Sequence, residues 1–230
     1  MTAAYRTEAL EPETASPVIL ALPKGRILGE CGPLLARAGI RPDASLFDED
    51  SRHLRFATDD PALDVVRVRP FDVATFVAFG GAALGICGAD VLMEFDYPEI
   101  YAPLDPGIGA CRISVAEPRA TAGSDDSRTW STVRVASKYP NVARRHYAGR
   151  GVQAEVVHLN GAMELAPVLG LSRVIVDLVA TGSTLKANGL VETEVIAPIT
   201  SRLIVNRTAL KTRPEAIGGW IARFREALAA

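Results

Sequence analysis

The chain has 230 residues, of which 48% are hydrophobic and 23% are charged, and its formal net charge is -2. This balance is typical of a globular protein and excludes an extensively disordered chain. A net charge so close to zero gives no reason to expect a nucleic-acid or membrane surface, so any anion site must be a local pocket. The longest apolar runs fall far short of the roughly 20 residues needed to cross a bilayer.

The N-terminus and the cysteines indicate the compartment. Residues 1–17, MTAAYRTEALEPETASP, lack the basic start and apolar core of a signal peptide, and their composition predicts a flexible leader. Cys31, Cys87 and Cys111 show no CxxC spacing, so we expect buried free thiols in the reducing cytoplasm. The histidines share no ligand spacing, so the pattern predicts no metal site built by the protein alone.

Strand and helix patterns alternate along the chain. The first half predicts, in order, a strand at 18–22, a helix at 27–38, a strand at 64–68, a helix at 72–79 and a strand at 83–87. A strand at 110–116, containing CRISVA, leads into a polar stretch, 118–129, that predicts a loop. The second half predicts a strand at 132–136, a helix at 141–149, a strand at 153–158, a helix at 164–169, a strand at 173–176 ending at Asp177, a strand at 201–205 and a helix at 214–228.

This order of elements predicts an α/β protein with two lobes around a cleft. We expect lobe I to contain residues 18–113 and 200–230, and lobe II residues 114–199, with CRISVA and a later strand as the hinge. Ligands of α/β sheets bind beyond the carboxyl ends of strands. The polar residues at those ends therefore form the candidate site.

The segment VIVDLVATGSTL, residues 174–185, carries the strongest functional pattern. A buried strand runs to Asp177, and the loop Thr181–Thr184 follows with three hydroxyls and a glycine before a short helical turn. Unpaired N–H groups and the dipole at a helix start favour phosphate, and Asp177 is placed to accept hydrogen bonds from sugar hydroxyls. Alternatively, the loop is only a solvated helix cap, since Ser, Thr and Gly are favoured there.

Charged residues also mark the strand ends in LPKGRI (22–27), RPFDVATFV (69–77) and ALGICGADVL (83–92). The positions concerned are Lys24, Gly25, Arg26, Arg69, Asp72 and Asp90. Cations at a sharp backbone turn suit phosphate groups. Alternatively, the basic pair around Gly25 starts a solvated helix and Asp90 is simply a helix N-cap.

The loop after Asp177 resembles the phosphoribosyl pyrophosphate (PRPP) loop of phosphoribosyltransferases. Leu178 stands where the common type I enzymes have a second acid, which disfavours a base-salvage enzyme. Together, the segments resemble the short-form ATP phosphoribosyltransferase family. Further matching stretches are LDPGIGACRISVA (104–116), VRVASKYPNVARR (133–145), LNGAMELAP (159–167) and SRLIVNR (201–207).

The resemblance covers roughly residues 18–213 and implies a fold similar to a type II periplasmic binding protein. It implies that the ribose 5-phosphate of PRPP is held by Asp177, Thr181, Gly182, Ser183 and Thr184. The phosphates of ATP and the pyrophosphate would be neutralised by Lys24, Arg26 and Arg69, with Gly25, Asp90 and Glu164 in the ATP part of the cleft. Arg112, on the predicted hinge strand, either reaches the same pocket or is structural.

The family reaction is displacement at the anomeric carbon of PRPP by N1 of ATP, which opens histidine biosynthesis. N1 is already a nucleophile, so no activated Ser, Cys or His is expected. The resemblance implies Mg²⁺, held mainly by substrate oxygens. It also implies a cytoplasmic homodimer within a hetero-oligomer, expected to be a hetero-octamer, with a regulatory subunit resembling histidyl-tRNA synthetase.

Two other functions stay open on the sequence alone. A two-lobed binding protein would close on a small anion without chemistry, since fold does not determine function. A base-salvage phosphoribosyltransferase would use a free base in place of ATP. The missing export signal and the combination of Asp177 with the TGST loop count against the binding protein.

Overall fold

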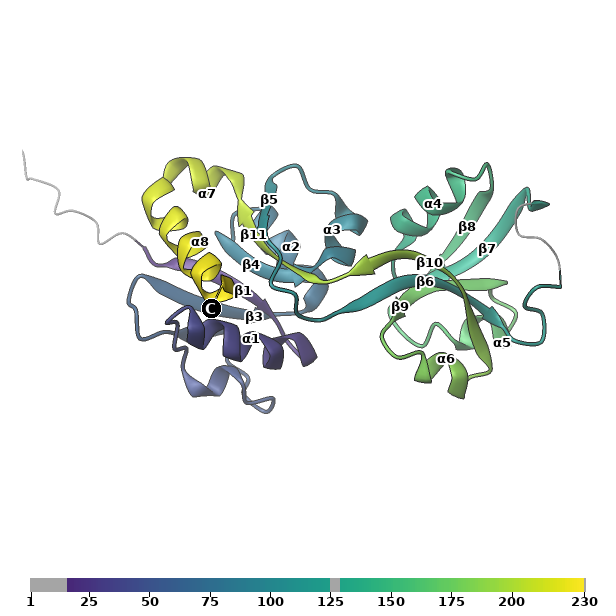
Figure 1. Ribbon diagram of the computed structural model, residues 1–230, viewed down its shortest axis with the longest axis horizontal. Coiled ribbons are helices and arrows are strands. Elements are labelled where there is room, and N and C mark those ends of the chain that lie inside the picture. Colours follow the sequence, from purple (N-terminus) through teal and green to yellow (C-terminus); the bar gives the residue numbers. More distant parts are fainter. Residues whose placement is uncertain (1–15, 125–128, 230) are drawn as a thin grey trace, which may run out of the picture.

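The computed structural model describes residues 16–124 and 129–229. Most of the predicted leader, 1–17, and positions 125–128 of the predicted loop therefore lie outside the described residues. Within the described ranges the strands form two sheets, and Figure 1 shows one sheet in each half of an elongated molecule. We refer to the part built on the 6-stranded sheet as lobe I and to the part built on the 5-stranded sheet as lobe II.

Lobe I is built on a mixed sheet. Across the sheet the strands are β2 (Arg55–Ala57), β3 (Leu63–Val68), β1 (Val18–Pro23), β4 (Leu84–Gly88), β11 (Ser201–Asn206) and β5 (Ile100–Leu104). The strands β3, β1 and β4 are parallel, whereas β2, β11 and β5 run antiparallel to their neighbours. The helices are α1 (Arg26–Arg37), α2 (Pro70–Ala78), α3 (Ala89–Phe95), α7 (Arg207–Thr212) and α8 (Pro214–Ala229), with a 3-10 turn at Ala44–Leu46.

Helices cover both faces of the lobe I sheet. Leu20 and Leu22 of β1 pack with apolar side chains of α1 and α8, whereas Ala21 packs with those of α2 and α3. Successive side chains of a strand point to opposite faces, so a strand covered on both faces must be apolar throughout. This is why β1, VILALP, is a continuous apolar run.

Lobe II repeats this layering with a different strand order. Its strands are β10 (Leu190–Ile199), β6 (Cys111–Pro118), β9 (Val174–Val179), β7 (Thr132–Ser137) and β8 (Gln153–His158). The strands β9, β7 and β8 are parallel, β6 is antiparallel to β9, and β10 is antiparallel to β6. The helix α4 (Pro140–Ala148) packs on one face, and α5 (Leu165–Val168) and α6 (Ser183–Ala187) pack on the other.

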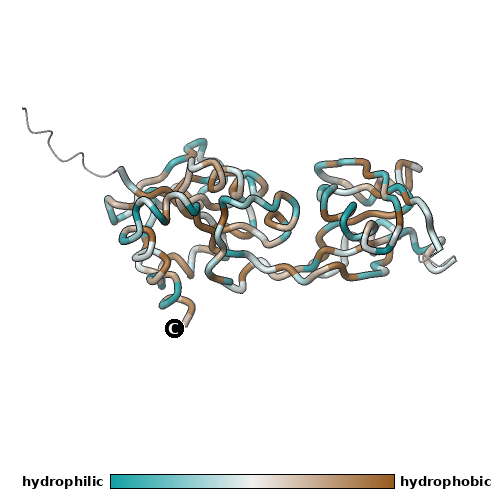
Figure 2. The backbone as a smooth tube through the Cα atoms, turned by 90° about the horizontal axis from the view of Figure 1, so that it is seen from above, coloured by the Kyte–Doolittle hydropathy of each residue, from teal (hydrophilic) through white to brown (hydrophobic). Residues whose placement is uncertain are grey.

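Two long antiparallel strands connect the lobes. The chain enters lobe II along β6 and returns along β10 into β11 of lobe I. Figure 2 shows the lobes side by side along the long axis, with this strand pair running between them. The predicted crossing point at 113–114 lies inside β6, whose pairing with β10 begins at Cys111.

The lobes also touch through α3 and the start of α4. Glu94 of α3 is only 3% exposed, and its carboxylate accepts hydrogen bonds from the backbone N–H groups of Asn141 and Val142 at 3.0 Å. The unpaired N–H groups and the dipole at a helix start stabilise a carboxylate there, which allows its burial. The Tyr139 hydroxyl donates to the Asp90 carboxylate at 2.7 Å. These contacts restrict rotation of one lobe against the other.

The structure corrects two of the sequence predictions. Asp177 lies inside β9, which continues to Val179, rather than at the end of its strand. Gly88, not Asp90, is the N-cap of α3, and Asp90 lies in the first turn with a buried side chain. The sequence patterns also missed β2, β5, β10 and α7. The strands β2, β5 and β10 lie at sheet edges, β10 is only partly buried and carries the polar run Glu192–Glu194, and α7 has no buried residue.

Gly85 in β4 occupies one of the most tightly packed backbone positions. A Cβ atom there would lie 2.9 Å from methyl carbons of both Val73 and Val77. We therefore expect Gly85→Ala to lower the free energy of unfolding by about 1–3 kcal/mol, measured by urea denaturation, because overpacking forces the helix α2 away from the sheet. Gly219→Ala in α8 is the control, since a Cβ there meets nothing within 4 Å. It should stabilise the protein by up to about 1 kcal/mol, and equal effects of the two substitutions would contradict the packing argument.

Candidate active site

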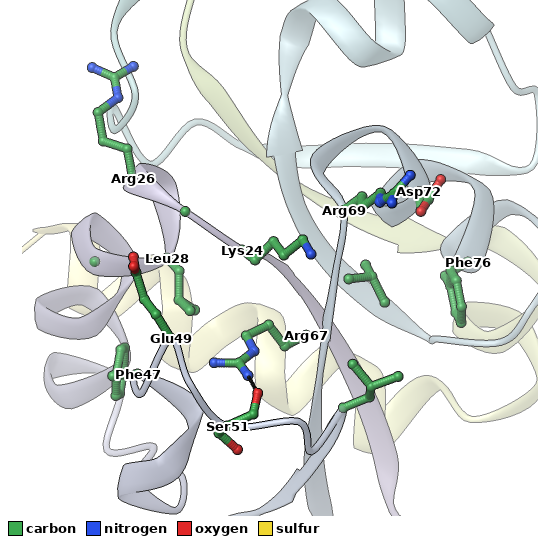
Figure 3. A pocket seen from close by; sticks show the side chains of 14 residues that line it. Lys24, Arg26, Leu28, Phe47, Glu49, Ser51, Arg67, Arg69, Asp72 and Phe76 are labelled. Carbon is green, nitrogen blue, oxygen red and sulfur yellow. Dashed lines mark hydrogen bonds between the residues drawn. The ribbon is translucent and has the colours of Figure 1, made fainter. Parts of the chain in front are cut away.

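The carboxyl ends of β1 and β3 form the first pocket, which lies in lobe I and has a volume of about 1000 Å³. The polar residues lining it include Lys24, Arg26, Arg67, Arg69 and Asp72, and Gly25 lies between the first two. The backbone N–H of Lys24 donates to the carbonyl of Val68 at 2.9 Å, which ties the two strand ends together. Figure 3 shows Lys24 and Arg67 at the centre of this group.

The start of α1 adds a second feature suited to anions. Gly25 precedes the helix with φ 90° and ψ -152°, a backbone conformation that is essentially restricted to glycine. No side chain caps α1, so the unpaired N–H groups of its first turn and the helix dipole are available to an anion. The Arg26 guanidinium lies 3.8 Å from Glu30, and Figure 3 shows it directed away from Lys24.

Arg67 is a residue of this pocket that the sequence analysis missed. It is 7% exposed, and its guanidinium donates to the carbonyl oxygens of Leu46 at 2.7 Å and of Asp48 and Ser51 at 2.6 Å. Arg67 therefore holds the loop that forms the opposite wall of the pocket. Its signal in the sequence was a single arginine within the apolar strand LDVVRV, residues 63–68.

The second pocket lies in lobe II and has a volume of about 190 Å³. Its polar residues are Glu164, Asp177, Thr181, Ser183 and Thr184, with Gly182 between them. The Thr181 and Ser183 hydroxyl oxygens lie 2.9 Å apart, and Gly182 is the left-handed N-cap of α6 with φ 78°. The hydroxyls therefore gather where the chain turns from β9 into α6.

Asp177 has an unusual charge environment. The pKa of its carboxyl is raised to about 6, mainly because burial disfavours the charged form. The Leu178 N–H, which donates to the carboxylate at 2.8 Å, opposes this rise, and the nearby Glu164 carboxylate adds to it. Lys138 and Asp90 also act on Asp177 electrostatically. Lys138, at the end of β7, was another omission of the sequence analysis, and the strand-end rule applied to that segment would have found it.

The structure therefore distributes the predicted site residues over three places. Lys24, Gly25, Arg26 and Arg69 line the lobe I pocket, whereas Asp177 and Thr181–Thr184 line the lobe II pocket. Asp90 is 5% exposed, and burial raises the pKa of its carboxyl at the contact between the lobes. Glu164, expected beside Asp90, lines the lobe II pocket with the hydroxyl loop. Their individual roles stay predictions.

Comparison with known proteins decides the family. The family model of ATP phosphoribosyltransferase (HisG) matches residues 69–226. The ATP phosphoribosyltransferase of Gluconobacter oxydans (strain 621H) is 68% identical over 213 residues, which cover 93% of this chain and 88% of that protein. The chain belongs to the ATP phosphoribosyltransferase family. The ATP phosphoribosyltransferase of Paramagnetospirillum magneticum is 67% identical over 210 residues, covering 91% of this chain and 96% of that protein.

A solved structure of the same family supports the architecture. A chain of the ATP phosphoribosyl transferase (HisG:HisZ) complex from Thermotoga maritima superposes with a TM-score of 0.77 at 30% sequence identity, covering 92% of this chain and 97% of that chain. The predicted two-lobed α/β fold of the family is confirmed. None of the helices in residues 16–124 and 129–229 has the length and apolar character needed to cross a membrane.

Proposed function

We propose that this chain transfers the phosphoribosyl group of PRPP to N1 of ATP and releases pyrophosphate, the first step of histidine biosynthesis. One observation carries the proposal. A chain of the ATP phosphoribosyltransferase family presents a hydroxyl loop with a partly buried carboxylate, Asp177, in one lobe and a cation-lined pocket in the other. The two pockets suit two different polyanionic substrates.

In the proposed reaction the N1 lone pair of adenine forms a bond to C1 of the ribose. The bond from C1 to the pyrophosphate oxygen breaks, and its electron pair leaves with pyrophosphate. The residues of the loop Thr181–Thr184 bind the 5-phosphate, and Asp177 accepts hydrogen bonds from ribose hydroxyls. Lys24, Arg26 and Arg69 offset the charge of the ATP phosphates and the pyrophosphate. The protein thus acts by bringing the reacting atoms together and by compensating charge, without an activated nucleophile.

Magnesium is part of the proposal. The polar side chains that line the lobe II pocket carry only oxygen atoms, the ligand type that Mg²⁺ prefers. The ion would arrive with the polyphosphates, which supply most of its ligands, and would offset negative charge on the pyrophosphate. We expect a chelator to abolish transfer without changing the circular dichroism spectrum. Full activity in the chelator would remove magnesium from the proposal.

We also propose that the chain forms a homodimer within a hetero-octamer with a regulatory subunit resembling histidyl-tRNA synthetase. The support is that the similar Thermotoga maritima chain was solved in a HisG:HisZ complex. A cytoplasmic location is part of the same proposal, and the three free thiols, two of them buried, suit a reducing compartment. Size-exclusion chromatography with light scattering, with and without the partner, tests the assembly, and a monomer in both conditions would contradict it. Cell fractionation tests the location.

The deciding experiment is pyrophosphate release from the purified chain with ATP, PRPP and Mg²⁺, with and without the partner subunit. Release that requires both substrates, together with an N1-ribosylated ATP product, supports the proposal. Release with a free base in place of ATP would indicate a salvage enzyme. PRPP binding without release in either condition would favour a binding protein.

The pH dependence provides a further prediction. The ionised Asp177 carboxylate accepts stronger hydrogen bonds than the protonated acid, so kcat/KM for PRPP should fall as the pH drops through about 6, where its carboxyl is half protonated. Glu164→Gln removes a neighbouring negative charge and should move this acid limb to lower pH. The phosphates of PRPP titrate equally in both profiles, so the difference between them reports Asp177. Superimposable acid limbs would contradict this assignment.

A further inference from the structure

Arg112 of β6 reaches the chain segment that leads into the hydroxyl loop. In the sheet, Arg112 lies opposite Val179 of β9, and its guanidinium Nη1 donates to the carbonyl oxygen of Ala180 at 3.1 Å. Ala180 itself lines the lobe II pocket, immediately before Thr181. A side chain on a connecting strand therefore contacts the backbone at the base of the loop.

Glu192 of β10 holds Arg112 in this position. The Nε and Nη2 atoms of Arg112 donate to the two carboxylate oxygens of Glu192, both at 2.5 Å, and the Ser114 hydroxyl donates to the same carboxylate at 2.7 Å. These hydrogen bonds keep the pKa of the Glu192 carboxyl below its usual value. Such a two-point contact between planar groups leaves the Arg112 guanidinium little rotational freedom. The remaining nitrogen, Nη1, is therefore held in the direction of the Ala180 carbonyl.

The contact at Ala180 sets the direction of an N–H group. The Ala180 carbonyl and the Thr181 N–H belong to one planar peptide unit, in which they point in opposite directions. Fixing the carbonyl on the Arg112 side therefore directs the Thr181 N–H to the other side. A loop that binds phosphate through N–H groups depends on such orientation, because a displacement of about 1 Å at a reacting site can cost about a hundredfold in rate.

We propose that Arg112, held by Glu192, is a positioning residue that orients the Thr181–Thr184 loop for the phosphate group of PRPP. This inference rests on the proposed function for the identity of the ligand. It does not require contact between Arg112 and the substrate. In this proposal the strands β6 and β10 both connect the lobes and carry the residues that orient the loop.

The chain contains a matched control pair. Glu194 lies two residues further along β10 and forms an ion pair with both terminal nitrogens of Arg150. The side chains of Arg150 and Glu194 are 40% and 30% exposed, similar to 33% and 23% for Arg112 and Glu192. His146 also lies 3.5 Å from Glu194, but neither Glu194 nor Arg150 lines the lobe II pocket.

The test compares Arg112→Met, Glu192→Gln and the double variant with Arg150→Met and Glu194→Gln. We expect Arg112→Met to raise KM for PRPP about tenfold and to change KM for ATP less than about twofold, the loss expected for one charged hydrogen bond. Glu192→Gln should act in the same direction. The double variant should match Arg112→Met alone, because the two residues act as one unit. The control pair should leave both KM values unchanged.

A second readout does not depend on activity. Amide hydrogen exchange at residues 181–184, measured without ligand, should accelerate in Arg112→Met and Glu192→Gln and stay unchanged in the control variants. Glu192→Gln is nearly isosteric, so it keeps the test valid if Arg112→Met fails to fold.

The outcomes separate the inference from the proposed function. An unchanged or lower KM for PRPP in Glu192→Gln overturns the inference. Such a result would mean that Arg112 does not depend on Glu192 for its effect, as expected if Arg112 bound the substrate directly. Equal increases of both KM values, or the same increase in the control pair, would mean a general loss of stability and also overturn it. If the wild-type protein transfers nothing, the proposed function fails, and the exchange rates alone decide whether Arg112 orients the loop.

Discussion

Replacing Lys24 by alanine should lower kcat/KM for the transfer to ATP by about 10²–10³-fold, the effect of losing one preorganised electrostatic partner. Lys24 lies at the carboxyl end of β1 and lines the pocket of about 1000 Å³ in lobe I. Its backbone N–H is bonded to the Val68 carbonyl, so the substitution removes the ammonium group and leaves the strand end in place. Without that charge, the repulsion between two polyanionic substrates and the charge on the departing pyrophosphate are less well compensated.

Steady-state kinetics with PRPP and ATP varied separately measure this effect. Arg26→Ala should produce a loss of the same order, because Arg26 lines the same pocket, although its side chain points away from Lys24 in Figure 3. The control is Arg41→Ala, which removes an exposed cation of lobe I that lines neither of the two pockets. Wild-type activity in both Lys24→Ala and Arg26→Ala would remove these residues from the site.

Asp177→Asn should raise KM for PRPP by about 10- to 100-fold and change KM for ATP far less. The carboxylate accepts hydrogen bonds from ribose hydroxyls in the proposed complex, and a hydrogen bond to a charged group contributes about 1.5–3 kcal/mol. Asparagine keeps the shape of the side chain and one acceptor oxygen, but it carries no charge. The loss should therefore appear in binding of the substrate that carries the ribose.

The stability of the variant separates this effect from misfolding. The folded-state pKa of Asp177 lies near 6, above the ordinary value of 3.8, so the ionised carboxylate destabilises the fold above that pH. Asparagine removes this cost, and Asp177→Asn should be at least as stable as the wild type at neutral pH in urea denaturation. Glu155→Gln, which removes an exposed carboxylate of lobe II paired with Arg134, is the kinetic control. Equal losses for PRPP and ATP in Asp177→Asn would contradict the assignment.

The elements that carry the candidate site were predictable because their signals are local. The strand β1 is covered on both faces and is therefore apolar along its whole length, and β9 runs into a loop whose glycine must adopt φ 78°. Lys24, Arg26 and Asp177 stand next to or within such strands. Their positions along the chain predicted a place at strand ends, where α/β proteins bind ligands; Lys24 and Arg26 follow β1 directly, whereas Asp177 lies two residues before the end of β9.

Contacts between segments far apart in the sequence could not be predicted from local hydrophobic and turn patterns. Arg67 binds backbone carbonyls 14 to 21 positions away, Glu94 caps a helix of the other lobe 47 positions away, and Arg112 reaches Ala180 across 68 positions. A carbonyl or N–H group is present at nearly every residue, so its use as a partner leaves no mark in the composition.

The sequence by itself determined the alternating elements, the anion-suited strand ends and the resemblance to a family, because hydrophobic period and turn chemistry are properties of short segments. Only the tertiary structure decided that Asp90 is buried at the contact between the lobes, that Glu164 lies with the hydroxyl loop, and that Arg112 holds the base of that loop. Burial and orientation depend on which strands pair and in which register. Strand pairing and register are decided by the free energy of the whole packed molecule. In it, a charged side chain is buried only where groups from other segments form hydrogen bonds or ion pairs with it.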